Sequence, residues 1–367
     1  MKISCSKNNL LNGVQIVYKA VPSKTTMTIL ECILIEAFNG RIKLTANDTE
    51  LGIETYIEGN ISEEGDICID ARMLQDMVRK LPDNDIKIET DEKNTAFITC
   101  EKSRCNISGK SSEEFSYLPD LEKDNPLIIS QYNLKEVVRQ TIFSTAPETE
   151  PNKMMTGELF EIKGNRLRVA ALDGHRLSIR NIELRNVYDD KRVIVPGKVL
   201  NEISKILSGD TDKDVSIYFT KNHILFEFDE TVVVSRLLEG KYFNIDQMLT
   251  SDYETKFNIN KKEFIDCIDR SMLFVKEGDK KPLSIDVTDN NIAVSISSSI
   301  GNFDEDIDIN KSGKDVKMGF NPKFILDALR AIDEENVDFY IVNAKAPCFI
   351  RDEKENYIYL VLPVNTR

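Results

Sequence analysis

The sequence is poor in the residues that most catalytic and metal centres use. It has no Trp and only two histidines, His175 and His223, and its seven cysteines are scattered without a Cys-x-x-Cys pair. Two separate histidines argue against a multi-histidine metal centre. An odd, scattered set of cysteines is typical of reduced thiols rather than of a disulfide framework or a zinc site. We therefore expect a cytoplasmic protein with no metal and no cofactor.

The sequence also lacks long hydrophobic runs and nucleotide-binding loops. No apolar run is long enough to span a bilayer, and the N-terminus has no apolar core of a signal peptide. G-x-G-x-x-G, Walker and G-x-S-x-G patterns are absent. These absences favour a protein that is not an enzyme. An enzyme with a hidden site at His175 stays open as an alternative, although no second catalytic group stands at a recognisable spacing from this histidine.

Positive charge is in the minority. The chain has 48 basic and 62 acidic side chains among its 367 residues, and its net charge is −14. Such a balance argues against a nucleic-acid-binding protein that is basic all over its surface. It leaves open a protein whose basic residues are confined to one face.

What the sequence does contain is a threefold internal repeat. The segments 70–81, 196–207 and 321–332 align without gaps about 125 residues apart. Each has apolar residues at helical spacing and follows a short apolar strand. A second helical segment recurs at 9–20, 133–144 and 261–272, with alternating strands between and after the helices. This order predicts an α+β fold of three tandem similar domains, at 1–122, 123–250 and 251–367.

Basic residues recur in the second helix of each repeat. They lie seven positions apart, about two helical turns, and so share one face. The pairs are Arg72 and Arg79, Lys198 and Lys205, and Lys323 and Arg330. Asp76, Glu202 and Asp327 stand between them at i+4, which is typical of ordinary surface ion pairs. The alternative is a repeated basic face that lines a passage for the phosphates of DNA.

One turn distinguishes the middle repeat. In the segment LDGHRL (172–177), Asp173 and Gly174 stand between two alternating runs, which predicts a hairpin with both residues at positive φ. The corresponding ANDTELGI of the first repeat has no His-Arg pair and aligns with a turn one residue shorter. SISSSIGNFDED in the third repeat lacks the pair as well. We therefore interpret LDGHRL as an addition to the middle copy.

Several motifs together resemble a known family. ALDGHRLSIR (171–180), VIVPGK (193–198), LEGKYFN (238–244) and YIYLVLPV (357–364) are similar to segments of the bacterial sliding clamps, the beta subunit of DNA polymerase III. The resemblance covers the whole chain. It implies a head-to-tail homodimeric ring with helices lining the hole and sheets outside. It further implies a non-enzymatic processivity factor that encircles duplex DNA and tethers the replicative polymerase.

The resemblance also implies two sets of site residues. A partner-peptide pocket between the second and third domains is expected, with His175 and Arg176 as a polar rim that offers hydrogen-bond donors. Its residues would be Met155, Leu172, Gly174, His175, Arg176, Leu177, Phe243, Gln247, Met248, Asn321, Phe324, Lys345, Pro347, Leu360, Leu362, Pro363 and Val364. The expected DNA contacts are Lys24, Arg72, Arg79, Thr149, Lys153, Met154, Lys198, Lys205, Lys323 and Arg330.

The partners implied by the resemblance follow from this function. They are double-stranded DNA, bound without sequence preference, and a second copy of the chain. Proteins that carry a short clamp-binding motif would dock in the pocket: the DNA polymerase III alpha subunit, the clamp loader, other polymerases and repair factors. No membrane is involved, and the expected location is the cytoplasm, at the nucleoid. A scaffold that binds peptides through the same groove, but not DNA, is the remaining alternative.

Overall fold

The computed structural model describes residues 1–275 and 281–365. It has two compact units, Met1–Leu134 with Glu202–Leu237, and Lys135–Asn201 with Leu238–Arg367. The helices α3 (Gln131–Thr141) and α4 (Gly197–Ile206) run from one unit into the other. None of the described helices combines the length and the hydrophobicity needed to cross a bilayer.

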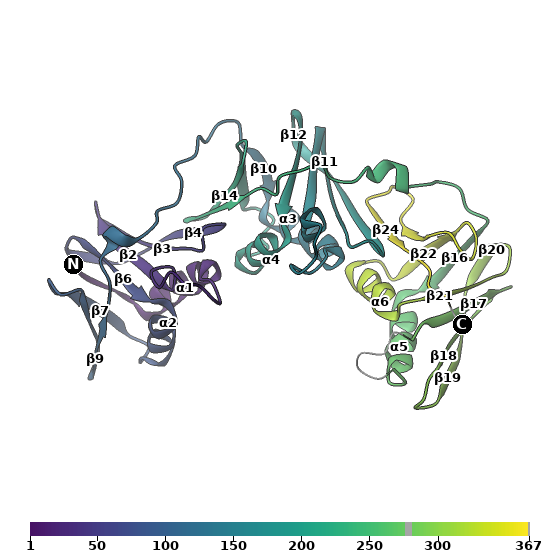
Figure 1. Cartoon of the computed structure of the whole chain (residues 1–367), viewed down its shortest axis with the longest axis horizontal. Coiled ribbons are helices and arrows are strands. Elements are labelled where there is room, and N and C mark those ends of the chain that lie inside the picture. Colours follow the sequence, from purple (N-terminus) through teal and green to yellow (C-terminus); the bar gives the residue numbers. More distant parts are fainter. Residues whose placement is uncertain (276–280, 366–367) are drawn as a thin grey trace. The chain divides into compact units, whose positions relative to one another are not determined.

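The first unit contains two antiparallel sheets. The five-stranded sheet has the order β5-β1-β7-β8-β9, and the eight-stranded sheet has the order β10-β13-β14-β15-β4-β3-β2-β6 (Figure 1). Helix α1 (Lys7–Val17) packs on α2 (Ala71–Lys80) and on β3 and β4. The strands are β1 (Lys2–Ser6), β2 (Cys32–Phe38), β3 (Arg41–Asn47), β4 (Leu51–Ile57), β5 (Asn60–Glu63), β6 (Gly65–Asp70), β7 (Asp85–Thr90), β8 (Thr95–Cys100), β9 (Ser103–Ser108), β10 (Leu127–Ser130), β13 (Asp214–Phe219), β14 (His223–Phe228) and β15 (Thr231–Arg236).

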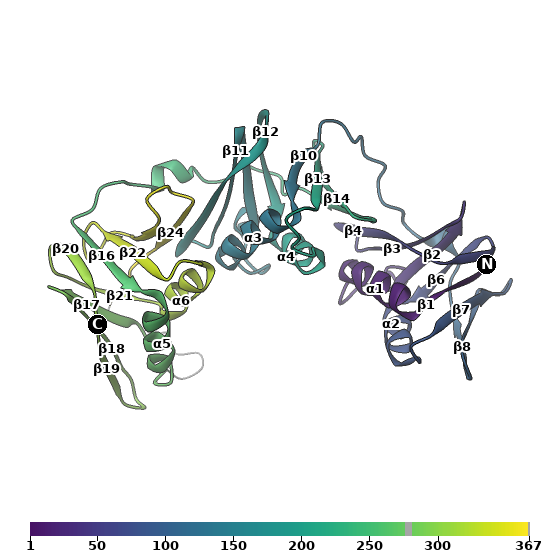
Figure 2. The same cartoon turned by 180° about the vertical axis from the view of Figure 1, so that it is seen from behind.

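The second unit is built in the same way. Its seven-stranded sheet has the order β11-β12-β24-β23-β22-β16-β20, and its four-stranded sheet has the order β19-β18-β17-β21 (Figure 2). Helix α5 (Lys261–Met272) packs on α6 (Pro322–Ala331). The strands are β11 (Gly157–Leu172), β12 (Arg176–Pro196), β16 (Thr255–Asn260), β17 (Leu283–Thr288), β18 (Asn291–Ser297), β19 (Asn302–Asp308), β20 (Asn310–Gly313), β21 (Val316–Phe320), β22 (Asn336–Ile341), β23 (Cys348–Arg351) and β24 (Tyr357–Val361).

The three repeated second helices lie where the apolar spacing predicted them, at α2, α4 and α6. Local chemistry explains the starts of α2 and α6. The Asp70 carboxylate accepts a hydrogen bond from the backbone N–H of Met73, and Asn321 caps α6 in the same way. The six repeated basic side chains are all exposed, while the opposite faces are buried. The helices are thus amphipathic, with their basic residues on the solvent side.

The interpretation of LDGHRL as an addition is wrong. Asn47 pairs with Gly52 as Leu172 pairs with Leu177, so both turns have four residues. Asp48 Oδ1 accepts from the second and third following N–H groups at 3.0 and 2.7 Å, and Asp173 Oδ1 does so at 3.0 and 3.1 Å. The side chains of the two turns differ, so the sequences do not reveal that the turns share one register. The pairing of the flanking strands defines this register.

The same turn confirms the expected positive φ for Gly174 but not for Asp173. Only the second turn residue has positive φ, at 83° for Gly174 and 76° for Thr49. Asp173 is present for its side-chain hydrogen bonds, which mimic a backbone turn. The third repeat has a hairpin at the same place, β18–β19, with Ser297 opposite Asn302 and four residues between them. All three repeats therefore carry one common hairpin.

Candidate peptide pocket and basic helical faces

The middle hairpin lies beside the end of the chain. Leu177 pairs with both Leu172 and Leu360, which aligns three leucines across β11, β12 and β24. Beyond this row, the N–H of Leu362 donates to the carbonyl of His175 at 2.9 Å. The structure thus brings together residues of the predicted pocket that lie almost two hundred positions apart in the sequence.

Arg176 makes its contacts within the chain and does not offer free donors at the rim of the predicted pocket. Its side chain is only 9% exposed, and its Nε and Nη1 pair with Asp173 at 3.0 Å and Asp327 at 2.6 Å. Nη2 donates to the carbonyl of Phe143, and the guanidinium lies 4.4 Å from the ring centre of Phe324. Each nitrogen is therefore engaged within the chain, in contrast to the expectation of free donors for a partner. Arg176 holds the hairpin against α6.

Asp327 also departs from its expected role. The predicted ion pairs form in the first two repeats, where Arg79 pairs with Asp76 and Lys205 with Glu202, both at 2.7 Å. In the third repeat Asp327 binds Arg176. Arg330 binds Asp269 of α5 at 2.9 Å instead. The prediction of an ion pair within the helix is wrong there, because the half-buried Arg176 of β12 binds the Asp327 carboxylate.

His175 and Gly174 are exposed at the tip of the turn. The imidazole of His175 stacks on Phe324, with 6.1 Å between ring centres and an angle of 23°. No side chain or backbone atom lies within 4 Å of a Cβ built on Gly174. This part of the predicted rim is open to a ligand.

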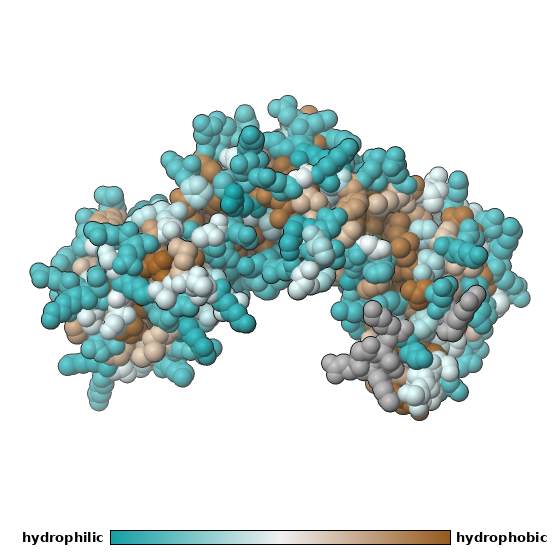
Figure 3. Space-filling model, viewed as in Figure 1, coloured by the Kyte–Doolittle hydropathy of each residue, from teal (hydrophilic) through white to brown (hydrophobic). Residues whose placement is uncertain are grey.

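A hydrophobic cluster forms the floor of the predicted pocket. Leu172, Leu177 and Leu360 belong to it and are buried, and half-buried Met155 and Phe243 pack against it. Three further residues of the predicted pocket are more exposed: Met248 at 39%, Leu362 at 37% and Val364 at 40%. Figure 3 shows hydrophobic surface over β24 and the neighbouring segment with η5 (Ile245–Met248). Exposed apolar side chains around a buried floor are typical of a docking groove.

The other predicted pocket residues lie at the ends of elements. Asn321 starts α6, Gln247 is exposed in η5, and Pro363 continues from β24. Lys345 and Pro347 lie in the turn before β23, whose first residue pairs with the last residue of β24. Turn ends and strand ends supply most of this set, which is common for binding sites.

The remaining predicted DNA contacts differ in exposure. Lys24, Thr149 and Lys153 are exposed, and Lys153 Nζ donates to the carbonyl of Glu148 at 2.5 Å. Met154 is half-buried and packs against the leucine cluster, and its sulfur lies 2.8 Å from the Cβ position of Gly240. Met154 is therefore part of the packing beside the pocket.

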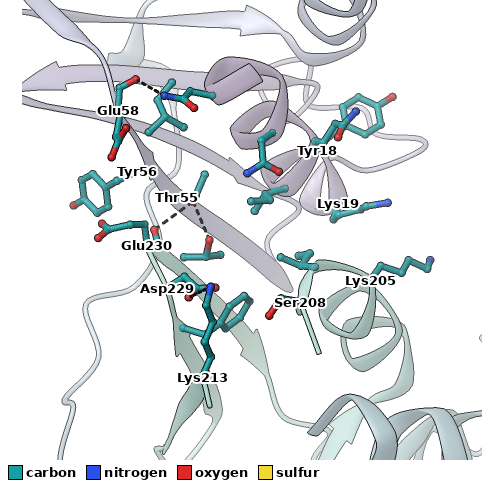
Figure 4. A pocket seen from close by; sticks show the side chains of 18 of the residues that line it. Tyr18, Lys19, Thr55, Tyr56, Glu58, Lys205, Ser208, Lys213, Asp229 and Glu230 are labelled. Atoms are coloured by element: carbon teal, nitrogen blue, oxygen red, sulfur yellow. Dashed lines mark hydrogen bonds and ion pairs between the residues drawn. The ribbon is translucent and has the colours of Figure 1, made fainter. Parts of the chain in front are cut away.

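A second hollow lies on the helical side of the first unit. It has a volume of about 840 Å³ between α1, the short helix η1 (Tyr18–Ala20), β4 and the end of α4. Glu202 lies between Lys19 at 3.7 Å and Lys205 at 2.7 Å. Both lysines extend to the same side (Figure 4). Sequence reasoning missed Lys19 because it stands outside the repeated helix, and no local pattern marks it.

Sequence reasoning also missed a buried carboxyl group. Glu158 in β11 is completely buried, and its Oε1 accepts a hydrogen bond from Thr141 Oγ1 at 2.8 Å. Its Oε2 has no partner among the described residues. Burial, opposed by the Thr141 hydrogen bond, raises the pKa of Glu158 to about 8. This side chain is therefore protonated at neutral pH.

The described residues contain no group of three or more His, Cys, Asp or Glu side chains placed to hold a metal ion. Buried cysteines have raised pKa values because burial disfavours the thiolate, as for Cys5 and Cys68, both at about 12. Such thiols are poor nucleophiles. None of these buried cysteines therefore supplies an activated catalytic thiol.

Comparisons with known proteins cover the whole chain. Residues 1–119, 128–244 and 246–365 match the N-terminal, central and C-terminal domains of the DNA polymerase III beta subunit. A beta sliding clamp of Staphylococcus aureus is 33% identical, with 100% of both chains covered. A Bacillus subtilis DNA polymerase sliding clamp is 31% identical with a TM-score of 0.96, and a protein of Eubacterium rectale assigned as a DNA polymerase III beta subunit is 61% identical with a TM-score of 0.96, both over 100% of each chain.

Proposed function

Since the chain belongs to the DNA polymerase III beta subunit family, the beta sliding clamps, we propose that it forms a ring around duplex DNA and tethers the replicative polymerase through its peptide pocket. The chain is an α+β protein of three tandem clamp domains, and the beta sliding clamp is a non-catalytic processivity subunit. The domain limits that we propose are 1–122, 123–250 and 251–367. The proposed location is the cytoplasm, at the nucleoid.

Ring closure is supported by a strand pairing that the first two hairpins share. The second strand of the first hairpin, β4, pairs with β15, and that of the middle hairpin, β12, pairs with β24. Both β15 and β24 are the last strand of a three-stranded meander. The third hairpin ends in β19, and the first meander ends in β9. Within the described residues both are sheet edges. This repeated pairing is the observation that carries the proposal.

We propose that β19 of one copy pairs with β9 of a second copy, head to tail. Two such contacts close a ring of two chains and leave neither edge exposed. The charges are complementary, because β19 contains the exposed Asp304 and Asp306 while β9 contains the exposed Arg104. Leu273 after α5 is 76% exposed, and a partner would cover it.

DNA binding is supported by the exposed basic residues of α2, α4 and α6. A closed ring holds DNA by topology, so individual phosphate contacts can be weak and easily exchanged. The ion pairs of Arg79 with Asp76 and of Lys205 with Glu202 temper the charge of these lysine and arginine side chains. Such contacts would permit sliding, and the acidic remainder of the surface would repel DNA from the outside.

Partner binding is supported by the apolar groove. Met248, Leu362 and Val364 offer exposed apolar surface for leucine and phenylalanine side chains of an extended segment. His175 and Gly174 leave the turn side open, while Arg176 keeps the turn in place. The proposed partners are the DNA polymerase III alpha subunit, the clamp loader, and other polymerases and repair factors. A ring that cannot leave DNA keeps a modest-affinity partner at high local concentration.

The closing contact is tested by charge reversal. Lys102→Glu, at the exposed residue just before β9, with Arg104→Glu in β9 would oppose the acidic β19. We then expect sedimentation at micromolar concentration to show mainly monomer. Adding Asp304→Lys and Asp306→Lys to the same chain restores opposite charges and should restore the dimer. A single reversal at exposed Lys221 is the control. A dimer that tolerates the β9 reversal unchanged would contradict this closing contact.

Encirclement is tested on closed circular DNA loaded with the protein. The dimer should remain on circles through a high-salt wash and leave as soon as a nuclease linearises them. Equal retention on linear and circular DNA would contradict the ring. A protein that binds the peptide but never DNA would favour the scaffold alternative.

A further inference from the structure

A smaller pocket of about 220 Å³ lies in the first unit, where β4 pairs with β15. It is partly covered by the segment that follows η2 (Ser112–Glu114). Its lining residues are Asn47, Thr49, Glu50, Gly52, Ser116, Tyr117, Leu118, Pro119, His223, Val234 and Arg236. No part of the function proposed above uses this pocket.

The backbone around this pocket repeats that of the peptide pocket. Gly52 pairs with Asn47 and Val234, as Leu177 pairs with Leu172 and Leu360. The next ladder bond agrees as well. The N–H of Arg236 donates to the carbonyl of Glu50 at 3.0 Å, and the N–H of Leu362 donates to that of His175 at 2.9 Å. The two sites therefore share three strands in one register.

The correspondence extends to the neighbouring strand. Val234 pairs with Leu225 as Leu360 pairs with Phe349. Two residues before these partners stand His223 in the first unit and Pro347 in the second. A chain segment lies along each pocket, with 116–119 in the first unit and 243–248 in the second. The hairpin, the two strands beside it and the covering segment of the predicted peptide pocket thus have counterparts here.

The side chains of the two pockets differ, and this difference changes the kind of ligand that each pocket would bind. Arg236 takes the place of Leu362, and Gly52 that of Leu177. A Cβ on Gly52 would lie 1.8 Å from Leu118 Cδ2. The side chain of Leu118 therefore covers Gly52, at the position that Leu177 occupies in the other pocket. The floor keeps apolar contacts from Leu118 and Val234, while the rim is polar and Tyr117 is 54% exposed.

The rim carries the charges of both Arg236 and Glu50, but the two side chains do not form an ion pair. Among the described residues, the exposed Arg236 guanidinium makes no ion pair, whereas each nitrogen of Arg176 at the other site is engaged. Burial, and then the charge of Arg236, lower the pKa of His223 below its ordinary value. Its ring is therefore neutral at pH 7, and Arg236 supplies the cation.

We propose that this pocket is a second docking site, and that it takes an extended acidic peptide segment of a partner protein. A carboxylate of the segment pairs with Arg236, and a neighbouring apolar side chain rests on Leu118 and Tyr117. Glu50 stands opposite Arg236 and disfavours the acidic segment. The inference rests on the proposed function of the other pocket by analogy, but it can be tested separately.

The test uses two fluorescein-labelled heptapeptides, one with the centre Asp-Asp-Leu-Phe and one uncharged with the centre Leu-Leu-Phe. Fluorescence anisotropy at pH 7 and 0.15 M salt gives their affinities for the full chain. Arg236→Ala should weaken the acidic peptide by about tenfold or more and leave the uncharged one unchanged. Glu50→Gln should strengthen the acidic peptide. Arg166→Ala, at an exposed arginine of β11, is the matched control.

Leu362→Ala separates the two sites. It should weaken the uncharged peptide, while the loss of acidic-peptide affinity caused by Arg236→Ala should be the same with and without Leu362→Ala. If the uncharged peptide fails to bind but the acidic one binds through Arg236, the peptide pocket of the proposed function loses support and this inference stands. If the acidic peptide does not bind, or binds equally well to Arg236→Ala and the unaltered chain, the inference is overturned.

Discussion

Replacing Glu158 by glutamine is expected to remove a dependence of stability on pH. The carboxyl group is completely buried, with one hydrogen bond from Thr141 and one oxygen without a partner among the described residues. Its pKa is raised from 4.5 to about 8 in the folded chain. Glutamine has nearly the same shape as the protonated acid and can accept the same hydrogen bond. The substitution thus mimics the neutral form.

The sign and size follow from proton linkage. Between pH 4.5 and 8 the unfolded chain has lost this proton while the folded chain keeps it, so rising pH favours unfolding. The cost is about 1.4 kcal/mol per pH unit, or about 3 kcal/mol between pH 5 and pH 7.5. Glu158→Gln carries no such cost. Its advantage over the unaltered chain should grow with pH through this window and level off above pH 8.

Urea unfolding followed by circular dichroism at several pH values measures this difference. The comparison of variant and unaltered chain at each pH cancels the titration of all other groups. Glu183→Gln, at an exposed position of β12, is the control and should give a difference that does not change with pH. An equal difference for Glu158→Gln at pH 5 and pH 7.5 would refute the reasoning, because the carboxyl group would then be ionised in the folded chain.

Three further predictions concern the proposed sites. Arg176→Ala should lower the unfolding free energy by about 2–3 kcal/mol in the same urea assay, because it leaves Asp327 half-buried without its partner; an effect below about 0.5 kcal/mol would contradict its anchoring role. Leu362→Ala should weaken an uncharged leucine-phenylalanine peptide by about tenfold in anisotropy titrations, and an unchanged affinity would remove this residue from the pocket. Lys198→Gln with Lys205→Gln should reduce the salt dependence of DNA binding, as log K against log salt, by about 2, and an unchanged slope would exclude both from phosphate contact.

The amphipathic helices could be predicted from local sequence. The apolar spacing locates α2, α4 and α6 and places the basic residues on the exposed face, and polar residues mark the starts of α2 and α6. This succeeds because a helix satisfies its hydrogen bonds within one segment and is capped by adjacent residues. The threefold repeat was visible for the same reason, since each copy carries the whole pattern.

The turns and charges could not be predicted as well. LDGHRL looked unique because side-chain identity differs from DTEL, yet the pairing of Asn47 with Gly52 shows one common register. Asp327 was expected to form an ion pair within its own helix, but it binds Arg176, which lies 151 positions away in the sequence. Register and ion pairing depend on which strands and helices meet, and no short window of sequence contains that information.

The sequence by itself determined the α+β class, the three repeats and the amphipathic helices, because periodicity and capping act within a few residues. Only the tertiary structure decided that Arg176 anchors a turn, that Glu158 is buried with a raised pKa, and that the proposed peptide pocket has a polar counterpart beside Arg236. Each of these depends on groups brought together from distant segments. Burial and pairing, which set their charge state and their availability, arise only when the sheets assemble.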